Sequence, residues 1–159
     1  MANTQSMCTS FLGQLLSAGH NFANNNVART ANTVDTFKAA LYLTTATINA
    51  ATTAYASGNE VSGTNYTAGG VTVTNANNPA YTNSSSTAGV GYWTPSSSIV
   101  YTNVTLSTAF DTMLLYNSSQ SNAAVAVYTF GSQTITAGNF TLTMPSNTTT
   151  TALVRLSTT

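Results

Sequence analysis

The sequence predicts an all-β protein, an antiparallel β-sandwich or jelly roll of about seven to nine strands with a short N-terminal helix. Short stretches in which apolar and polar residues alternate indicate strands with one buried face. Residues that favour turns separate these stretches about every ten residues, as in sandwiches. No stretch between them is suited to the long helical crossovers that parallel strands require. The 159 residues are enough for one hydrophobic core.

The beginning of the chain has a different period. Between residues 4 and 18, apolar residues recur in steps of four, at Met7, Phe11 and Leu15. This spacing predicts an amphipathic helix, which Gly19 would end in the left-handed conformation. Such a short helix is not stable alone, so we expect it to pack on the sheet or on a neighbouring subunit.

A polar connection that contains Asn24 and Asn25 follows the helix. We therefore expect residues 1–34 to form an N-terminal helix and arm, and residues 35–159 to form the β-sandwich domain. The predicted strands lie at residues 36–44, 71–74, 90–93, 99–106, 112–116, 124–130, 139–144 and 152–156. The first of these is expected to bury one face. Residues 117–122 are predicted to be a hairpin loop.

Residues 58–70 are rich in glycine and small polar residues, which predicts a series of turns. Gly63, Gly69 and Gly70 are expected to supply positive φ angles there, because a glycine adopts them without steric cost.

Charge is nearly absent from this chain. Six residues carry a formal charge and the net charge is zero, whereas 68 of the 159 residues are Thr, Ser or Asn. Three basic residues cannot neutralise many phosphates, so we expect no nucleic-acid partner. The runs of apolar residues are far shorter than a membrane span, and no signal peptide is evident at the start, so no membrane association is expected. A neutral surface suits a protein whose surface becomes an interface.

Few residues are suited to catalysis. His20 is the only histidine and Cys8 the only cysteine; we expect Cys8 to be buried and His20 to lie at the helix end, where its protonated form would be stabilised. The three carboxylates are scattered, and no phosphate-binding loop or set of metal ligands is present. We therefore expect no enzymatic activity, no cofactor and no metal.

Aromatic residues are the remaining candidates for binding. Tyr66, Tyr81, Tyr92 and Trp93 lie in or beside the stretch rich in Gly, Ser and Asn. Aromatic residues mixed with small polar ones are typical of adaptable interfaces and sugar-binding faces. The alternative is that Trp93 and about half of the tyrosines belong to the core or its rim.

Several stretches, spread over nearly the whole chain, resemble a family of small virion structural proteins of tailed bacteriophages. They are Asp35–Tyr42, Thr52–Tyr55, Glu60–Gly70, Leu115–Ser119, Ala124–Val127, Phe130–Thr134 and Thr136–Leu142. The resemblance implies a component of the virion, and we favour a capsid decoration (cement) protein on the capsid exterior. Its partners would be the major capsid protein and copies of itself, in a homotrimer.

Two other functions remain open. One is a tail, fibre or tail-tip subunit with a face that binds a receptor or glycan, and the other is a lectin or carbohydrate-active module. For the cement function, the candidate contacts are in the N-terminal helix and the arm up to residue 33, and they include Met7, Phe11, Leu15, Asn24 and Asn25. For the tail and lectin functions, the candidates are the aromatic residues between positions 66 and 101, and they include Tyr66, Tyr81, Tyr92 and Trp93.

Overall fold

A computed structural model describes residues 3–16, 19–23, 34–74, 76–82 and 89–157. These residues form strands and one helix: β1 (Ser6–Met7), α1 (Thr9–Leu16), β2 (Phe37–Leu43), β3 (Val71–Thr72), β4 (Ala80–Tyr81), β5 (Val90–Trp93), β6 (Ile99–Asn117), β7 (Ala123–Leu142) and β8 (Val154–Ser157). All strand pairs are antiparallel. One sheet has the order β1-β7-β6-β2-β3 and the other β4-β5-β8. The predicted all-β class with a short N-terminal helix is confirmed.

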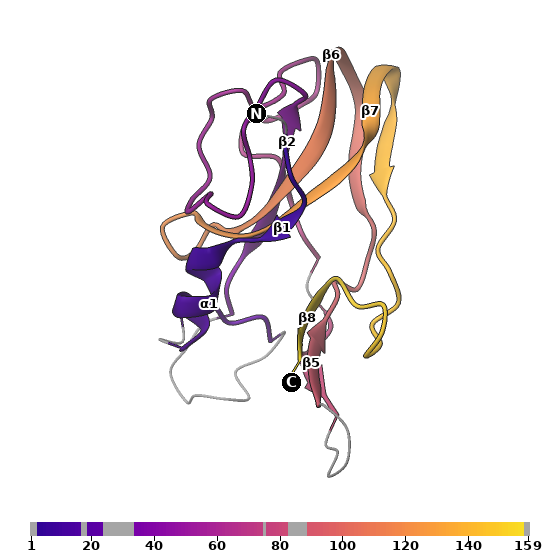
Figure 1. The fold of residues 1–159 in the computed structure, drawn as a ribbon. Coiled ribbons are helices and arrows are strands. Elements are labelled where there is room, and N and C mark those ends of the chain that lie inside the picture. Colours follow the sequence, from indigo (N-terminus) through magenta and orange to yellow (C-terminus); the bar gives the residue numbers. More distant parts are fainter. Residues whose placement is uncertain (1–2, 17–18, 24–33, 75, 83–88, 158–159) are drawn as a thin grey trace.

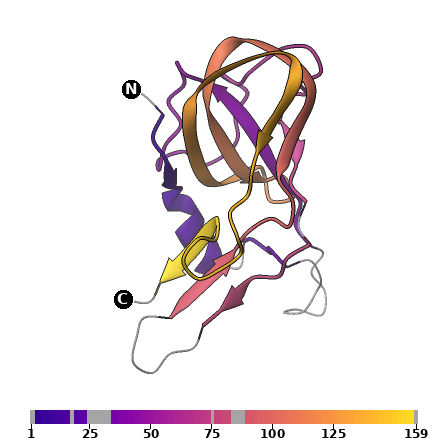
Figure 2. The same ribbon diagram turned by 90° about the vertical axis from the view of Figure 1, so that its right-hand side faces the viewer.

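The largest element is the hairpin of β6 and β7, which curls back over itself (Figures 1 and 2). Four separate strands were expected here, but β6 has 19 residues and β7 has 20. The register shifts repeatedly along the pair. Such bulges increase the twist of a sheet without ending its strands. After each bulge, the apolar residues point to the opposite face. The alternation of apolar and polar residues in the sequence is therefore interrupted although the strand continues. Phe110 of β6 and Phe130 and Phe140 of β7 pack together, with ring centroids 5.0–6.0 Å apart.

Strand β2 lies between β6 and the edge strand β3 in the five-stranded sheet, and it is buried more completely than expected. Its predicted buried face contains Ala39 and Leu41, but Ala40 and Tyr42, which point to the other side, are also 0 % exposed. The connection that follows β2 covers this second side, because the Tyr42 hydroxyl donates a 2.6 Å hydrogen bond to the Ala56 carbonyl. A strand that is covered on both faces loses the alternation that predicts a half-exposed strand.

The N-terminal segment packs against the same core as the sheets. Strand β1 pairs with β7 before α1 begins, so the helix is shorter than the predicted range. Cys8 and Phe11 are 0 % and 1 % exposed and belong to one hydrophobic cluster with β2 and β6. Gly19 does not have a positive φ; instead its N–H donates to the Gln14 carbonyl at 2.7 Å. The division of the chain at residue 34 stays a prediction.

Helix α1 has eight residues. In the part of the chain that the structure describes, no helix has the length and apolar character to span a membrane.

A candidate docking groove between the helix and the small sheet

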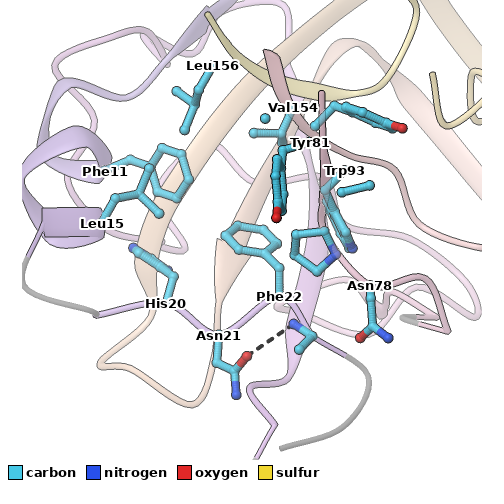
Figure 3. Close-up of a pocket in the computed structure, with 15 residues that line it drawn as sticks. Phe11, Leu15, His20, Asn21, Phe22, Asn78, Tyr81, Trp93, Val154 and Leu156 are labelled. Atoms are coloured by element: carbon cyan, nitrogen blue, oxygen red, sulfur yellow. Dashed lines mark hydrogen bonds between the residues drawn. The ribbon is translucent and has the colours of Figure 1, made fainter. Parts of the chain in front are cut away.

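An apolar groove with a volume of about 480 Å³ lies between α1, residues 20–23 and the three-stranded sheet. Figure 3 shows side chains from α1 on one side of the groove, with Leu156, Val154 and Trp93 among those on the other sides. The lining residues are Phe11, Leu15, His20, Asn21, Phe22, Ala23, Asn78, Pro79, Ala80, Tyr81, Gly91, Tyr92, Trp93, Val154 and Leu156. None of these described residues is an aspartate, glutamate, lysine or arginine.

Stacked aromatic rings form the base of the groove. Phe22 stacks on Phe37 of β2, with centroids 4.3 Å apart and an angle of 17° between the planes. Trp93 contacts Phe22 at 4.8 Å, and its indole N–H donates to the Asn77 carbonyl at 3.2 Å. Phe11 meets Phe22 edge-to-face at 5.8 Å. These contacts between four separate parts of the chain fix the base, since aromatic pairs in such geometries add to the free energy of burial.

The small sheet forms one wall. Tyr81 of β4 lies directly opposite Gly91 of β5, and Gly91 lies directly opposite Leu156 of β8. Residues that are opposite in antiparallel strands point to the same face, so Tyr81 and Leu156 stand on either side of a glycine. Both are well exposed, at 72 % and 41 %. The wall therefore presents two apolar side chains to solvent, separated by a notch.

A network of hydrogen-bonded polar side chains surrounds His20, at the end of the groove away from Tyr81 and Leu156. The His20 Nε2 lies 2.8 Å from Gln14 Oε1, and its Nδ1 lies 3.1 Å from Asn117 Nδ2. The same Asn117 Nδ2 donates to Asp35 Oδ2 at 2.7 Å, and Asn117 Oδ1 accepts from the Ser119 N–H at 3.0 Å. These bonds fix the Asn117 amide with its nitrogen toward His20.

This network selects one protonation state of His20. Because Asn117 offers a donor, Nδ1 must accept, and the proton is on Nε2, where Gln14 Oε1 accepts it. A second proton would place two N–H groups against each other. Burial lowers the pKa of His20, and the carboxylate of Asp35 opposes this effect in part. The expectation that a protonated His20 is stabilised at the helix end is therefore wrong.

The lining of the groove is suited to binding apolar groups, and its described residues offer little for catalysis or metal binding. Both ring nitrogens of His20 are engaged within the protein. The Cys8 thiol is buried, as expected, and burial raises its pKa to about 11, where it is a poor nucleophile. In the described ranges, no three His, Cys, Asp or Glu residues lie together as metal ligands would. Concave, mostly apolar surfaces with a few polar groups are typical of binding sites.

The structure brings five of the predicted interface residues together here, namely Phe11, Leu15, Tyr81, Tyr92 and Trp93. Of these, Phe11 and Trp93 are almost wholly buried. Met7 lies in β1 and packs against the core. Tyr66 is also outside the groove, and its hydroxyl bonds Glu60 and the Leu41 N–H. Asn24 and Asn25 lie outside the described residues.

Sequence reasoning missed Phe22, Gly91 and Leu156 as parts of this site. The sequence pattern places Phe22 in the polar connection after the helix and gives Leu156 no role beyond the last strand. Gly91 carried a usable signal, because a glycine inside a strand often marks a close approach of another group.

Comparisons of the chain with protein-family models, curated proteins and solved structures found no match.

Proposed function

We propose that this chain is a non-enzymatic structural protein of a tailed-phage virion, a capsid decoration (cement) protein that binds and stabilises the major capsid lattice. The observation that carries the proposal is the uncharged apolar groove, whose rim exposes Tyr81 and Leu156. Contiguous exposed apolar surface marks interaction sites on proteins. The phage assignment rests on the sequence resemblance.

The surface chemistry supports a role in an assembly. Charged residues are 4 % of the chain, and interface cores are depleted of charge. Many neutral hydroxyl and amide side chains can form hydrogen bonds to a lattice without the cost of burying charges. A role on the capsid exterior, with the major capsid protein and copies of the chain as partners, agrees with this surface. The homotrimer stays a prediction.

A tail, fibre or tail-tip subunit is the second candidate. The exposed ring of Tyr81 would suit a glycan, because sugars stack on aromatic rings. The number of copies per purified virion separates these functions, since a decoration protein is present in hundreds and a tail subunit in about tens or fewer.

The groove is tested by adding purified protein to capsids of the encoding virus that lack it, and measuring occupancy by cryo-electron microscopy. We expect Leu156→Asp to lower the affinity at least about tenfold, because it places a charge on the apolar rim. The control is Val100→Asp, because Val100 is 40 % exposed, almost the same as Leu156, but lies on β6 outside the groove. Equal occupancy by both variants, or no binding of the unchanged protein, would contradict the proposal.

A further inference from the structure

The segment of residues 19–23 places one of its aromatic rings at the base of the groove. The Phe22 ring lies 4.3 Å from the Phe37 ring and 4.8 Å from the Trp93 ring, measured between centroids. Figure 3 shows Phe22 and His20 on the same stretch of chain, both directed into the groove. The base of the groove therefore depends on where this segment is held.

Asn117 faces His20 and is fixed at both ends of its side-chain amide. It is 0 % exposed, its Oδ1 accepts from the Ser119 N–H, and its Nδ2 donates to Asp35 Oδ2. Rotation of this amide would leave both partners without their hydrogen bond, which is costly in a buried site. His20 belongs to a segment whose Asn21 N–H donates to the same carboxylate oxygen at 2.8 Å. If the two side chains conflict, we expect the segment to move and the amide to stay.

A proton added to His20 creates such a conflict. It must go to Nδ1, which lies 3.1 Å from Asn117 Nδ2, because the other ring nitrogen already donates its proton to Gln14 Oε1 at 2.8 Å. Two donors then face each other. The His20 ring is also half-buried, and burial makes the charged form less favourable.

Asp35 is the charged side chain with which His20 interacts among the residues that the structure describes. Its carboxylate favours the protonated ring, but both of its oxygens already accept hydrogen bonds, from Asn21, Asn117 and Gln120. Burial has the larger effect, so the pKa of His20 is lowered. The attraction to Asp35 therefore reduces the conflict without removing it. Arg29 lies outside the described residues.

We propose that residues 19–23 form an acid-sensitive latch, which protonation of His20 releases from the sheet together with Phe22 while β6 and β7 stay folded. Release uncovers Phe37 and Trp93 and removes the base of the groove, so the complete groove belongs to the neutral-pH state of the protein. The inference goes beyond the proposed function, because it holds whatever the groove binds.

The direction of the effect follows from proton linkage. In the released segment His20 has its ordinary pKa of 6.5, whereas the closed segment binds the proton less tightly. Release therefore takes up a proton when the pH falls below 6.5. The equilibrium shifts toward the released state by up to about tenfold for each pH unit, until the lowered pKa of the closed state is reached.

The test is amide hydrogen exchange of the full chain from about pH 7.5 to about pH 5, corrected for the intrinsic exchange rate at each pH. The Asn21 N–H is the reporter, because its bond to Asp35 exists only in the closed state. We expect its protection to fall by up to about tenfold per pH unit below pH 6.5, while the amides of β6 and β7 stay protected. His20 is the only histidine, so no other imidazole titrates in this range.

Two variants separate the charge of His20 from other effects of pH. In His20→Gln, the side-chain oxygen can accept from Asn117 and the amide nitrogen can donate to Gln14 without any titration, so the protection of Asn21 should not depend on pH. Gln14→Glu places a carboxylate beside Nε2 and stabilises the protonated ring in the closed segment, so protection should fall less than in the unchanged protein. Circular dichroism checks that each variant keeps its fold.

Three results would overturn the inference. The first is protection of Asn21 that does not fall with pH in the unchanged protein, as expected if the protonated ring pairs with Asp35 in place. The second is an equal fall in His20→Gln, and the third is a fall shared by the amides of β6 and β7, which would indicate unfolding of the whole chain.

Discussion

At the scale of single residues, the Tyr66 hydroxyl joins two parts of the fold. It accepts a hydrogen bond from the Leu41 N–H at 2.9 Å and donates one to Glu60 Oε1 at 2.8 Å. Tyr55 also donates to this carboxylate, at 2.6 Å, as does the Gly69 N–H at 2.7 Å. Burial is the main cause that raises the pKa of Tyr66, so the phenol stays protonated and can donate.

Tyr66→Phe should therefore destabilise the protein. The change leaves the Leu41 N–H in a buried strand without its acceptor and removes one donor from Glu60. We expect the free energy of unfolding to fall by about 1–3 kcal/mol, measured by chemical denaturation. Tyr81→Phe is the control, because that ring is 72 % exposed, and it should change stability by less than about 0.5 kcal/mol. Equal losses in both variants would contradict this account.

Gly70 is a position where no other residue fits. Its φ is +70°, and an added Cβ would lie 1.7 Å from the Ala39 carbonyl oxygen of β2. We expect Gly70→Ala to lower the free energy of unfolding by about 3 kcal/mol or more, because both backbone strain and a clash with strand β2 result. Thermal and chemical unfolding measure this. The control is Gly58→Ala, which should leave the free energy of unfolding nearly unchanged, since a Cβ added at Gly58 has no described atom within 4 Å. If Gly70→Ala is as stable as the unchanged protein, the loop can move away from Ala39 and the explanation is wrong.

The turn-rich sequence predicted some of this detail but not all of it. Gly69 and Gly70 do have the expected positive φ, whereas Gly63 does not. Gly63 is required for another reason, the close approach of the Thr105 carbonyl across an isolated bridge between residues 64 and 105. Local sequence indicates that a chain turns, but it does not show which distant backbone will pass beside the turn.

At the scale of elements, His20 connects α1 to the five-stranded sheet, and this connection should depend on pH. The folded state lowers the pKa of His20 below its ordinary value of 6.5. In the unfolded chain, His20 takes up a proton near pH 6.5, whereas the folded protein keeps it neutral to a lower pH. The unfolded state therefore binds more protons in this window, and stability falls as the pH decreases through it.

The measurement is the free energy of unfolding of the unchanged protein and of His20→Gln, from about pH 7.5 to about pH 5. The unchanged protein should lose more stability than His20→Gln as the pH falls, because only it carries the histidine. A parallel loss in the two proteins would show that protonation of His20 is compatible with the fold.

The elements themselves were predicted unevenly. The positions of β2, β5 and the hairpin loop after β6 followed from alternation and turn residues. The continuity of β6 and β7 did not, because bulges shift the pattern from one face to the other inside a single strand. Strand β4 has two residues, too few to show any period, yet it places Tyr81 beside Gly91.

At the scale of the whole molecule, the class of fold and the neutral surface could be read from the sequence, whereas the groove could not. Its walls come from α1, residues 20–23 and the strands β4, β5 and β8, which the folded chain brings together. Sequence spacing predicts which side chains share one strand face or one helix face. It does not predict which helix faces which sheet, and the groove is a property of that arrangement.

The neutrality of the molecule leads to a last prediction, about salt. Six charges of balanced sign in 159 residues give little long-range attraction, and no described residue lining the groove is an aspartate, glutamate, lysine or arginine. Raising the salt concentration from about 0.05 M to about 0.5 M screens interactions between charges but slightly strengthens apolar association. Capsid occupancy at a fixed protein concentration should therefore stay within about threefold across this range, whereas a contact made by ion pairs weakens strongly. A steep loss of occupancy with salt would show that the few charged residues, and not the apolar groove, hold the protein in its assembly.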